Sequence, residues 1–416
     1  MKLRAPLILL LSAAAVPAHA TSLEEAIAAG LTHAPEVAMA DAQADAAGAK
    51  LEQARSGSLP TVSVSGTIGV GRLDPRNFFG LGAANVTPRA AQASVEQPLF
   101  AGGRVQAGID QARAGISAAQ AGKTSARSQI SMAVTQAYGD VLTADRLGIL
   151  YGQMVTQMQE VLRQAQLRFK DGESPSTDVA QAKARLAEAQ AGLARAEGIK
   201  VSAAAHFANL TGLDATGLDP LPANPALPAT LEEAMEQARA HNPMLLQAEA
   251  GLRAAQAAAR GARGERLPTV GAFAEAASIR DQFFPGYIAD SATVGIRAKW
   301  DLFTGGRVSG KIAESDAGVR AAQAQRQSAE QAMQEQVISA FQNVRTAQLV
   351  ERAAADRADA AAQALESVRH EVRVGMKPQL DLLDAEREAI AASADAVRAQ
   401  TDRAVAAYQL LAVTGA

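Results

Sequence analysis

Two aspartates near the C-terminus, Asp381 and Asp384, are spaced so that their carboxylates could act together on a charged ligand. They follow Gly375 and Pro378, which predict a turn and then a helix on which residues three apart share one face. A shared face of carboxylates attracts cations. Alternatively, each acid near the helix N-terminus only stabilises the helix, through its interaction with the helix dipole, by about 0.3–1 kcal/mol. An internal repeat places Gln181 at the position equivalent to Asp384, which favours the cation interpretation, and the helix-terminus alternative stays open.

No other set of residues has the spacing of a catalytic or metal site. The five histidines include no His-x-x-x-His pair, and His33 and His241 each stand two positions before a proline, where a structural role is expected. The Gly-Lys-Thr at 122–124 lacks the upstream glycine of a phosphate loop, because Ser117 occupies that position. Neither a dinucleotide fingerprint nor a Gly-x-Ser-x-Gly motif occurs. We therefore predict that the chain is not an enzyme and uses no cofactor or metal.

The elements around these residues are organised by a motif that occurs twice. Leu-Phe-x-Gly-Gly-Arg-Val spans residues 99–105 and again 302–308. Alternating polar and apolar residues precede each copy, and apolar residues at helical spacing follow it, so each copy predicts a strand-to-helix junction. Two glycines allow the chain to bend there. The junction residues are Phe100, Gly102 and Gly103 in the first copy and Phe303, Gly305 and Gly306 in the second.

The whole chain is an internal duplication. Residues 59–62 (Leu-Pro-Thr-Val) recur 208 positions later, at 267–270. From Phe100 onward the offset is 203, so five residues are lost between Val270 and Trp300, and a loss of that kind predicts a loop. The predicted organisation is a signal peptide (1–20), a first structural repeat (21–211), a proline-rich linker (212–229) and a second repeat (230–416), with both repeats in one intertwined domain.

Each repeat contains two stretches with the period of a β-strand. In 61–70, valines and an isoleucine alternate with serine, threonine and glycine, and in 291–302 apolar residues alternate with Arg297 and Lys299. The segment 73–88, with Phe78-Phe79 in it, predicts a long loop. Such strands suit a transmembrane barrel with Arg297 and Lys299 in a wet lumen. A soluble sandwich is the alternative. Four strands cannot close a barrel, so several copies must combine.

Long helices follow both junctions. Apolar residues step by three and four after residue 104, which is coiled-coil spacing, and the helix could run roughly 100 Å at 1.5 Å per residue. Gly172 and Pro175 then turn the chain, with Ser174 as the expected N-cap and Pro175 as the first helical residue. Gly375 and Pro378 repeat this turn in the second half. The predicted fold is α+β, with each half a β-hairpin joined to a long helical hairpin.

The N-terminus and the composition bear on location. Lys2 and Arg4, an apolar run at 5–16 and an Ala-x-Ala site at 18–20 predict a signal peptide. The formal charge of −3 becomes about −5 without it, which argues against a nucleic-acid partner. The absence of cysteine excludes disulfides and a lipid anchor on cysteine. No later window approaches eighteen apolar residues, so any membrane crossing is expected to use strands.

On these features the chain resembles the TolC family of outer-membrane efflux proteins. The resemblance rests on the duplication, both Leu-Phe-x-Gly-Gly-Arg junctions and the run Gly-x-x-x-Gln-Leu-Asp-Leu-Leu-Asp-Ala at 375–385, and it covers essentially all of the mature chain. It implies a homotrimer that forms a twelve-stranded barrel in the outer membrane of a Gram-negative bacterium, continuous with a periplasmic tunnel of helical hairpins. The missing N-terminal cysteine and the short tail depart from some members, and we expect no lipidation.

The resemblance also implies a function and roles for the candidate residues. The function is a passive exit duct of a tripartite efflux or type I secretion system, served by a periplasmic adaptor and an inner-membrane transporter and embedded in outer-membrane lipid. Asp381 and Asp384 correspond to an acidic ring at the periplasmic entrance, and Lys377 to a basic residue that helps to hold that entrance shut. An exported, soluble coiled-coil scaffold without a pore is the alternative, and drugs, proteins and metals remain open as cargo.

Overall fold

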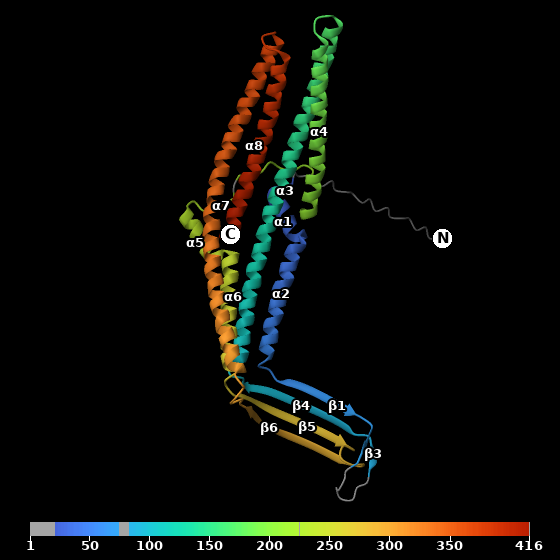
Figure 1. Ribbon diagram of the computed structural model, residues 1–416, viewed down its shortest axis with the longest axis vertical. Coiled ribbons are helices and arrows are strands. Elements are labelled where there is room, and N and C mark those ends of the chain that lie inside the picture. The colour runs from blue at the N-terminus through green and yellow to red at the C-terminus, as the bar shows by residue number, and fades with distance from the viewer. Residues whose placement is uncertain (1–20, 75–82, 224, 416) are drawn as a thin grey trace, which may run out of the picture. The chain divides into compact units, whose positions relative to one another are not determined.

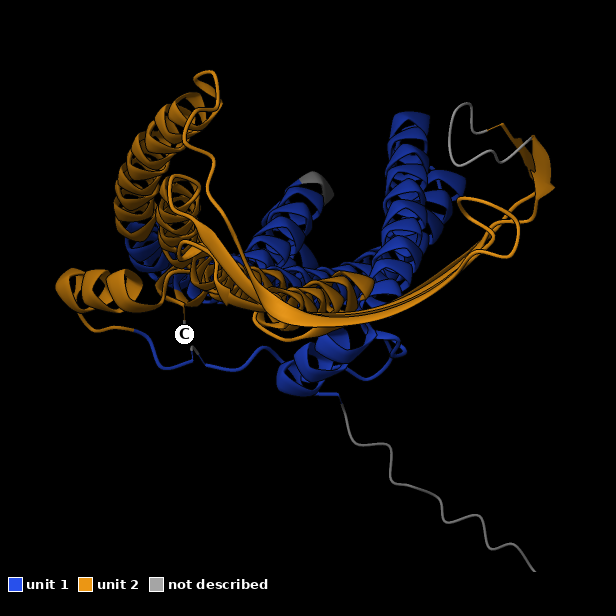
Figure 2. Ribbon diagram, turned by 90° about the horizontal axis from the view of Figure 1, so that it is seen from below, with its two compact units in different colours: residues 1–34, 128–227, 340–410 blue, residues 35–127, 228–339, 411–416 orange. Residues whose placement is uncertain are grey.

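The computed structural model describes residues 21–74, 83–223 and 225–415 (Figure 1). The predicted signal peptide and Phe78-Phe79 lie outside the described residues. The chain divides into two compact units that alternate along the sequence (Figure 2). Unit 1 contains the described residues up to 34 together with 128–227 and 340–410, and unit 2 contains 35–127, 228–339 and the residues from 411 onward. Among the described residues, no helix has both the length and the apolarity needed to cross a membrane.

The two repeats contain the same helices and long strands in the same order, and the first repeat has two short strands, β2 and β3, in addition. The first repeat consists of α1 (Leu23–His33), α2 (Pro35–Ser56), β1 (Thr61–Ile68), β2 (Gly71–Leu73), β3 (Ala84–Val86), β4 (Arg89–Phe100), α3 (Arg104–Lys170) and α4 (Ser176–Thr211). The second consists of α5 (Leu231–His241), α6 (Pro243–Gly264), β5 (Thr269–Arg280), β6 (Ile288–Lys299), α7 (Arg307–Arg373) and α8 (Gln379–Thr414). Each half is therefore a β-hairpin followed by a long helical hairpin, as predicted.

The repeats are equivalent down to their helix caps. Ser22 caps α1, where its hydroxyl accepts a hydrogen bond from the Glu25 amide at 3.2 Å. Thr230 caps α5 by accepting from the Glu233 amide at the same distance of 3.2 Å. A serine or threonine in this position satisfies one of the amides that the first helical turn leaves free. The 208-residue offset in sequence is thus also an equivalence in structure.

The four long strands form one antiparallel sheet in unit 2, in the order β1-β4-β5-β6. Figure 2 shows this sheet as a curved band. Val62, Val95, Ala274 and Val294 lie opposite one another across the strands and so share a face. That face is open to the surroundings, with Val62 72% and Val294 84% exposed. The alternation predicted from sequence is confirmed.

The prediction that residues 73–88 form one long loop is partly wrong. Residues at its two ends belong to the paired strands β2 and β3, in which Leu73 lies opposite Ala84. Their register continues that of β1 and β4, so the hairpin extends beyond Ile68 after a short interruption. The corresponding connection in the second repeat, between Arg280 and Ile288, is a short turn, in agreement with the five-residue loss inferred from the offsets.

The long helices pack through small and β-branched residues. In the part of α3 that belongs to unit 1, the predicted apolar stripe is buried, and its members are Ile130, Val134, Ala137, Val141 and Ala144. Tyr138, on the same helix, is fully buried with its ring edge toward Phe207 of α4 at 6.1 Å. Its hydroxyl donates to the Thr21 carbonyl at 2.8 Å. An alanine-rich core of this kind lets helices approach closely, which holds the hairpins together along their length.

Candidate functional site

The turns that join the paired long helices have the same geometry in both repeats. Gly172 and Gly375 have φ of +76° and +77°, a left-handed conformation that residues with a side chain rarely adopt. Beyond each glycine an amide reaches back five residues, from Glu173 to the Arg168 carbonyl and from Met376 to the Glu371 carbonyl, both at 2.8 Å. These bonds define a Schellman motif, which satisfies carbonyls at the end of the first helix. The predicted turn positions are therefore correct.

The helix that follows the first turn begins one residue later than predicted, whereas α8 begins at Gln379, directly after the predicted turn. Pro175 is the N-cap of α4, with φ −74° and ψ 160°, and Ser176 is the first helical residue. Ser174 makes no cap, and its buried hydroxyl has no hydrogen-bond partner in the described residues. The prediction that Ser174 caps the helix is wrong. Within unit 1, Ser174 and Pro378 line a common groove of about 610 Å³, so the two turns lie at the same end of the paired hairpins.

Asp381 and Asp384 differ in their relation to the helix N-terminus. Asp381 is the third residue of α8, and its amide donates to the Pro378 carbonyl at 3.2 Å. Asp384 lies one turn further along and is exposed. A helix dipole acts mainly on the first turn, so it accounts for Asp381 but not for Asp384. In the described part of the chain neither carboxylate forms an ion pair, since the ammonium of Lys377 pairs with Glu371.

Lys377 stands beside this pair in the turn. Its ammonium forms an ion pair with Glu371 at 2.9 Å. The hydrogen bond to Glu371, with a smaller contribution from the charge of Asp381, raises the pKa of Lys377 above its usual value. The lysine therefore stays charged and is paired with Glu371, while the charge of Asp381 acts on it without a direct contact. Sequence reasoning missed Glu371, because it lies at the end of α7 in an ordinary helical pattern.

A buried carboxyl on the helix of the aspartates was also missed. The Glu386 side chain is only 4% exposed and lies 3.8 Å from the Arg369 guanidinium. With the Gln157 amide in the orientation that satisfies both neighbours, its nitrogen donates to Glu386 at 2.6 Å and its oxygen accepts from Arg369 at 3.2 Å. Burial raises the pKa of Glu386, and the nearby Arg369 offsets part of that effect. This cluster joins three long helices of unit 1, α3, α7 and α8.

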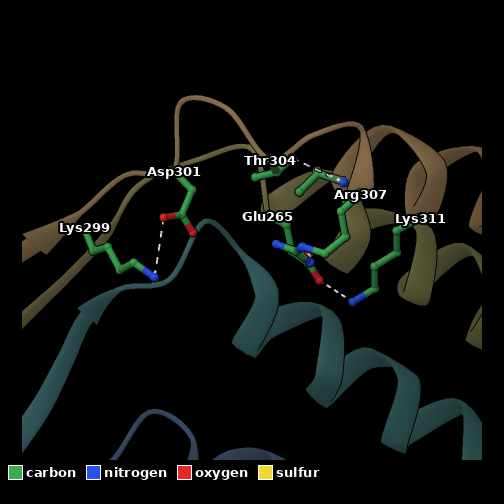
Figure 3. A network of polar contacts seen from close by, with 7 residues as sticks. Glu265, Lys299, Asp301, Thr304, Arg307 and Lys311 are labelled. Carbon is green, nitrogen blue, oxygen red and sulfur yellow. Dashed lines mark hydrogen bonds and ion pairs between the residues drawn. The ribbon is translucent and has the colours of Figure 1, made fainter.

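The second strand-to-helix junction is fastened by charges (Figure 3). Glu265, just after α6, binds the Arg307 guanidinium at 3.0 Å and also the Lys311 ammonium. These contacts, that of Lys311 above all, lower the pKa of Glu265. Gly305 and Gly306 have φ of +59° and +88°, so both glycines provide the predicted bend. The arginine of the motif thus ties the start of α7 to the end of α6.

The first junction is fastened by backbone contacts instead. Gly102 and Gly103 have φ of +63° and +77°. A side chain on Gly102 would lie 2.3 Å from the Gly264 carbonyl oxygen, so only glycine permits this approach to α6. Arg104, the equivalent of Arg307, donates to the Ala101 carbonyl at 3.0 Å. Phe100 and Phe303 are both exposed, at 46% and 89%.

The polar face of the sheet carries paired charges. Arg297 forms an ion pair with Glu96 at 3.2 Å and lies over the Phe273 ring at 4.7 Å. Lys299 pairs with Asp301 at 3.4 Å, and both are drawn in Figure 3. Arg297 and Lys299 share the face opposite Val294, as predicted. Within the described ranges, no group of three histidine, cysteine or acidic side chains could hold a metal ion.

Comparisons with known proteins agree with this architecture. Residues 27–213 and 234–416 match the family of outer membrane efflux proteins. The outer membrane efflux protein BepC of Brucella suis biovar 1 (strain 1330) is 27% identical over 87% of this chain and 78% of its own length. A membrane protein from Pseudomonas aeruginosa has the same fold, with a TM-score of 0.81 and 22% identity over 94% of this chain and 93% of its own. The CmeC outer membrane channel of Campylobacter jejuni also has a TM-score of 0.81, at 15% identity over 94% of this chain and 85% of its own.

The fold and the duplicated hairpins define an outer-membrane channel protein. The chain belongs to the outer membrane efflux protein family. It is an exit duct of efflux systems in the outer membrane of Gram-negative bacteria. Its relatives are efflux and channel proteins.

Proposed function

We propose that this duct works as a homotrimer in which Asp381 and Asp384 form an acidic ring at the periplasmic entrance. Three chains bring six carboxylates into one constriction, where low-dielectric walls strengthen their field and attract cations. Arg297 and Lys299 line the lumen of the barrel. The proposal is carried by the position of Asp384, which is exposed, beyond the first helical turn and on the same face as Asp381.

Lys377 is the gate of this entrance in the proposal. It is held by Glu371 at 2.9 Å and attracted by Asp381, so it fixes the turn between α7 and α8. A fixed turn keeps the hairpin end in one conformation. Release of this lysine loosens the entrance without altering the acidic ring.

The duct is passive, so energy and cargo selection come from its partners. We propose an inner-membrane transporter that loads the duct and a periplasmic adaptor that joins the two at the helical turns. The described residues carry no catalytic constellation that would drive transport. Co-purification of the duct with an adaptor encoded beside it tests this part of the proposal. Failure of the pair to associate in the presence of the transporter contradicts it.

The acidic ring is tested by single-channel recording in planar bilayers. We expect the wild-type trimer to prefer cations and to be blocked by multivalent cations added from the periplasmic side. The double change Asp381→Asn with Asp384→Asn removes six charges per trimer, so both properties should largely disappear. Asparagine keeps the size of the side chain, which preserves the fold of the turn.

Two further variants separate the ring from its alternatives. Asp178→Asn removes the acid at the equivalent helix start of the first repeat, where only a helix-terminus role is expected, and should leave selectivity unchanged. Lys377→Ala should raise the resting conductance and keep cation preference. If selectivity and multivalent block survive the double aspartate change, these residues act only at the helix terminus.

A further inference from the structure

We propose that Arg89 and Arg280 form a binding site for the phosphate group of a lipid in the outer leaflet of the membrane. The inference rests on the proposed barrel, with the apolar face of the sheet turned to lipid, and it deepens that proposal by naming the lipid chemistry that this face selects. It starts from two arginines that lie directly opposite each other on a face that is otherwise apolar.

The strand register places both arginines in one row across the sheet. Arg89 of β4 lies opposite Arg280 of β5, and Ile68 of β1 and Ile288 of β6 complete the row. Each of the four long strands begins or ends at this row. The opposite end of β5, at Thr269, closely follows α6, so the row lies at the end of the sheet away from the helices. With the helices on the periplasmic side, this end reaches the outer leaflet.

Both arginines belong to the apolar face. Side chains two positions apart on a strand share a face, so Arg280 lies on the side of Ala274 and Arg89 on the side of Val95. These two residues are in the exposed row that also contains valines of β1 and β6. In the four long strands, which the structure describes throughout, the charged residues on this face are Arg89, Arg280 and Asp290. All three lie in the last two rows, so charge is confined to one end of the face.

The apolar part of this face has the height of a membrane. On β6 it lies between Asp290 and Trp300, which are ten residues apart. Ten residues extend about 34 Å along a strand, or about 24–28 Å along the membrane normal at the usual strand tilt of about 35–45°. Outer-membrane barrels have an apolar band of about 25 Å. A cation is costly at the middle of that band and costs little at its border, so the arginines are placed at the level of the lipid headgroups.

The position of Arg280 is fixed by its neighbours. Its guanidinium donates to both carboxylate oxygens of Asp290, at 2.9 and 3.3 Å. The Ser278 hydroxyl donates to the same carboxylate at 2.7 Å. The turn that follows is closed by the Asp281 amide, which donates to the Tyr287 carbonyl at 2.8 Å. A cation held in this way loses little conformational freedom when it binds an anion, which favours binding.

Arg89 supplies a second cation without an acid of its own. It is exposed and forms no ion pair among the described residues, because Asp290 pairs with Arg280. Cβ atoms of directly opposed residues lie about 4.5–5.5 Å apart, where like charges destabilise a sheet. An anion that contacts both guanidinium groups replaces this repulsion by attraction. Phosphate suits the position, since guanidinium groups bind its oxygens through paired hydrogen bonds.

Aromatic residues beside the arginines favour a lipid as the source of the phosphate. In the turn after Arg280, the Tyr287 ring is edge-on to Phe283 at 5.0 Å and to Phe284 at 5.2 Å between ring centroids. Phe283 is exposed. Aromatic residues gather where a membrane protein meets the headgroup region. A phosphate at the arginines would place the acyl chains of its lipid along the apolar face, which a free phosphate ion would leave uncovered.

Binding of lipid A, the phosphorylated glycolipid of the outer leaflet, tests the site. Native mass spectrometry of the purified trimer in mild detergent measures how much lipid the protein retains, with dephosphorylated lipid A as the matched ligand. The wild-type protein should bind lipid A several-fold more tightly than the dephosphorylated form. Arg89→Gln should weaken the binding of lipid A several-fold and leave that of the dephosphorylated form unchanged. Equal binding of the two lipids by the wild-type protein overturns the proposal.

Two further variants test the face and the chemistry of the site. Arg297→Gln is the same exchange on the opposite face of the sheet and should leave lipid A binding unchanged. Arg89→Lys keeps the charge but not the paired donors, so it should retain only part of the wild-type affinity. Lipid A binding that is the same in Arg89→Gln as in the wild-type protein overturns the site.

The remaining outcomes separate this inference from the proposals on which it rests. Inorganic phosphate at the concentration of the lipid should not displace lipid A, and displacement would overturn the choice of a lipid. An intact trimer that shows no preference for the phosphorylated lipid overturns the lipid site alone. A wild-type protein that is monomeric by native mass overturns the proposed trimer.

Discussion

At the scale of single residues, we expect Glu386 to make the stability of the protein depend on pH. Its side chain is 4% exposed, and burial raises its pKa above the ordinary value of 4.5. The folded state then holds a proton that the unfolded state releases, so the stability from this group is complete at low pH and declines as the pH rises through the raised pKa. Each tenfold change in the ionisation constant corresponds to about 1.4 kcal/mol.

Glu386→Gln should abolish this decline, because a neutral amide cannot lose the proton. We expect the variant to unfold at a higher temperature than wild type near neutral pH and at a similar temperature near pH 4. Thermal unfolding in detergent followed by circular dichroism measures the difference. Glu388→Gln is the control, since Glu388 is 57% exposed and paired with Arg357. Equal pH profiles for wild type and Glu386→Gln would show that the buried acid does not titrate in this range.

The candidate residues differ in how far sequence could predict them. Asp381 and Asp384 were predictable because their relation depends on local spacing and on a turn marked by glycine and proline. Glu386 was not, because its environment comes from Gln157 and Arg369 on two other helices. From the sequence alone, a single acid in a helical pattern is expected to be exposed to solvent, because its partners on other helices are not known. Glu371 was missed because it lies in an ordinary helical pattern at the end of α7, and its pairing with Lys377 depends on the geometry of the turn.

At the scale of elements, two glycines of α3 differ in whether a neighbouring helix packs directly against them. A side chain on Gly139 of α3 would lie 2.1 Å from the Thr401 methyl of α8, which is 2% exposed. A side chain on Gly148 of the same helix would meet nothing within 4 Å. Alanine is favoured over glycine inside a helix by roughly 0.5–1 kcal/mol. The two positions therefore predict opposite effects of one substitution.

Gly148→Ala should stabilise the protein by about that amount, whereas Gly139→Ala should destabilise it by roughly 1–3 kcal/mol through overpacking. Both glycines lie in unit 1, and the substitution is the same, so helix propensity cancels in the comparison. Chemical unfolding of the detergent-solubilised protein gives both values. A gain in stability at Gly139 would mean that α3 and α8 are not in contact there.

Most elements were predictable because each rule involved was local. Period two identified β1 and β6, period 3.5 identified α3, and paired glycines identified the junctions. The short strands β2 and β3 were missed, because their segment is rich in glycine, asparagine and proline and their pairing is imposed by the hairpin they extend. The cap of α4 was misplaced by one residue, since Pro175 and Ser174 both suit a helix start and the choice depends on the turn geometry set by Gly172.

At the scale of the whole molecule, the sheet has to divide lipid from a watery lumen. Val62 and Val294 lie on one face, in a row across the sheet that runs through Val95 and Ala274, and Ser63 and Thr293 lie on the other face. Both faces are exposed, so packing inside the chain does not distinguish them. The distinction comes from the surroundings that the membrane imposes. Charged substitutions on neighbouring residues of β6 therefore test the assignment directly.

Val294→Arg should impair assembly strongly, because a charge on the lipid face near mid-bilayer costs about 2–4 kcal/mol. Thr293→Arg, one residue away on the face that we assign to the lumen, should cost far less and should lower the conductance for cations. The trimer yield in outer-membrane fractions and urea titration of protein folded into vesicles measure the two costs. Circular dichroism of the helices checks that neither change unfolds the rest of the chain. Equal losses for the two variants would mean that β6 does not separate lipid from lumen, and the barrel assignment of this sheet would then be wrong.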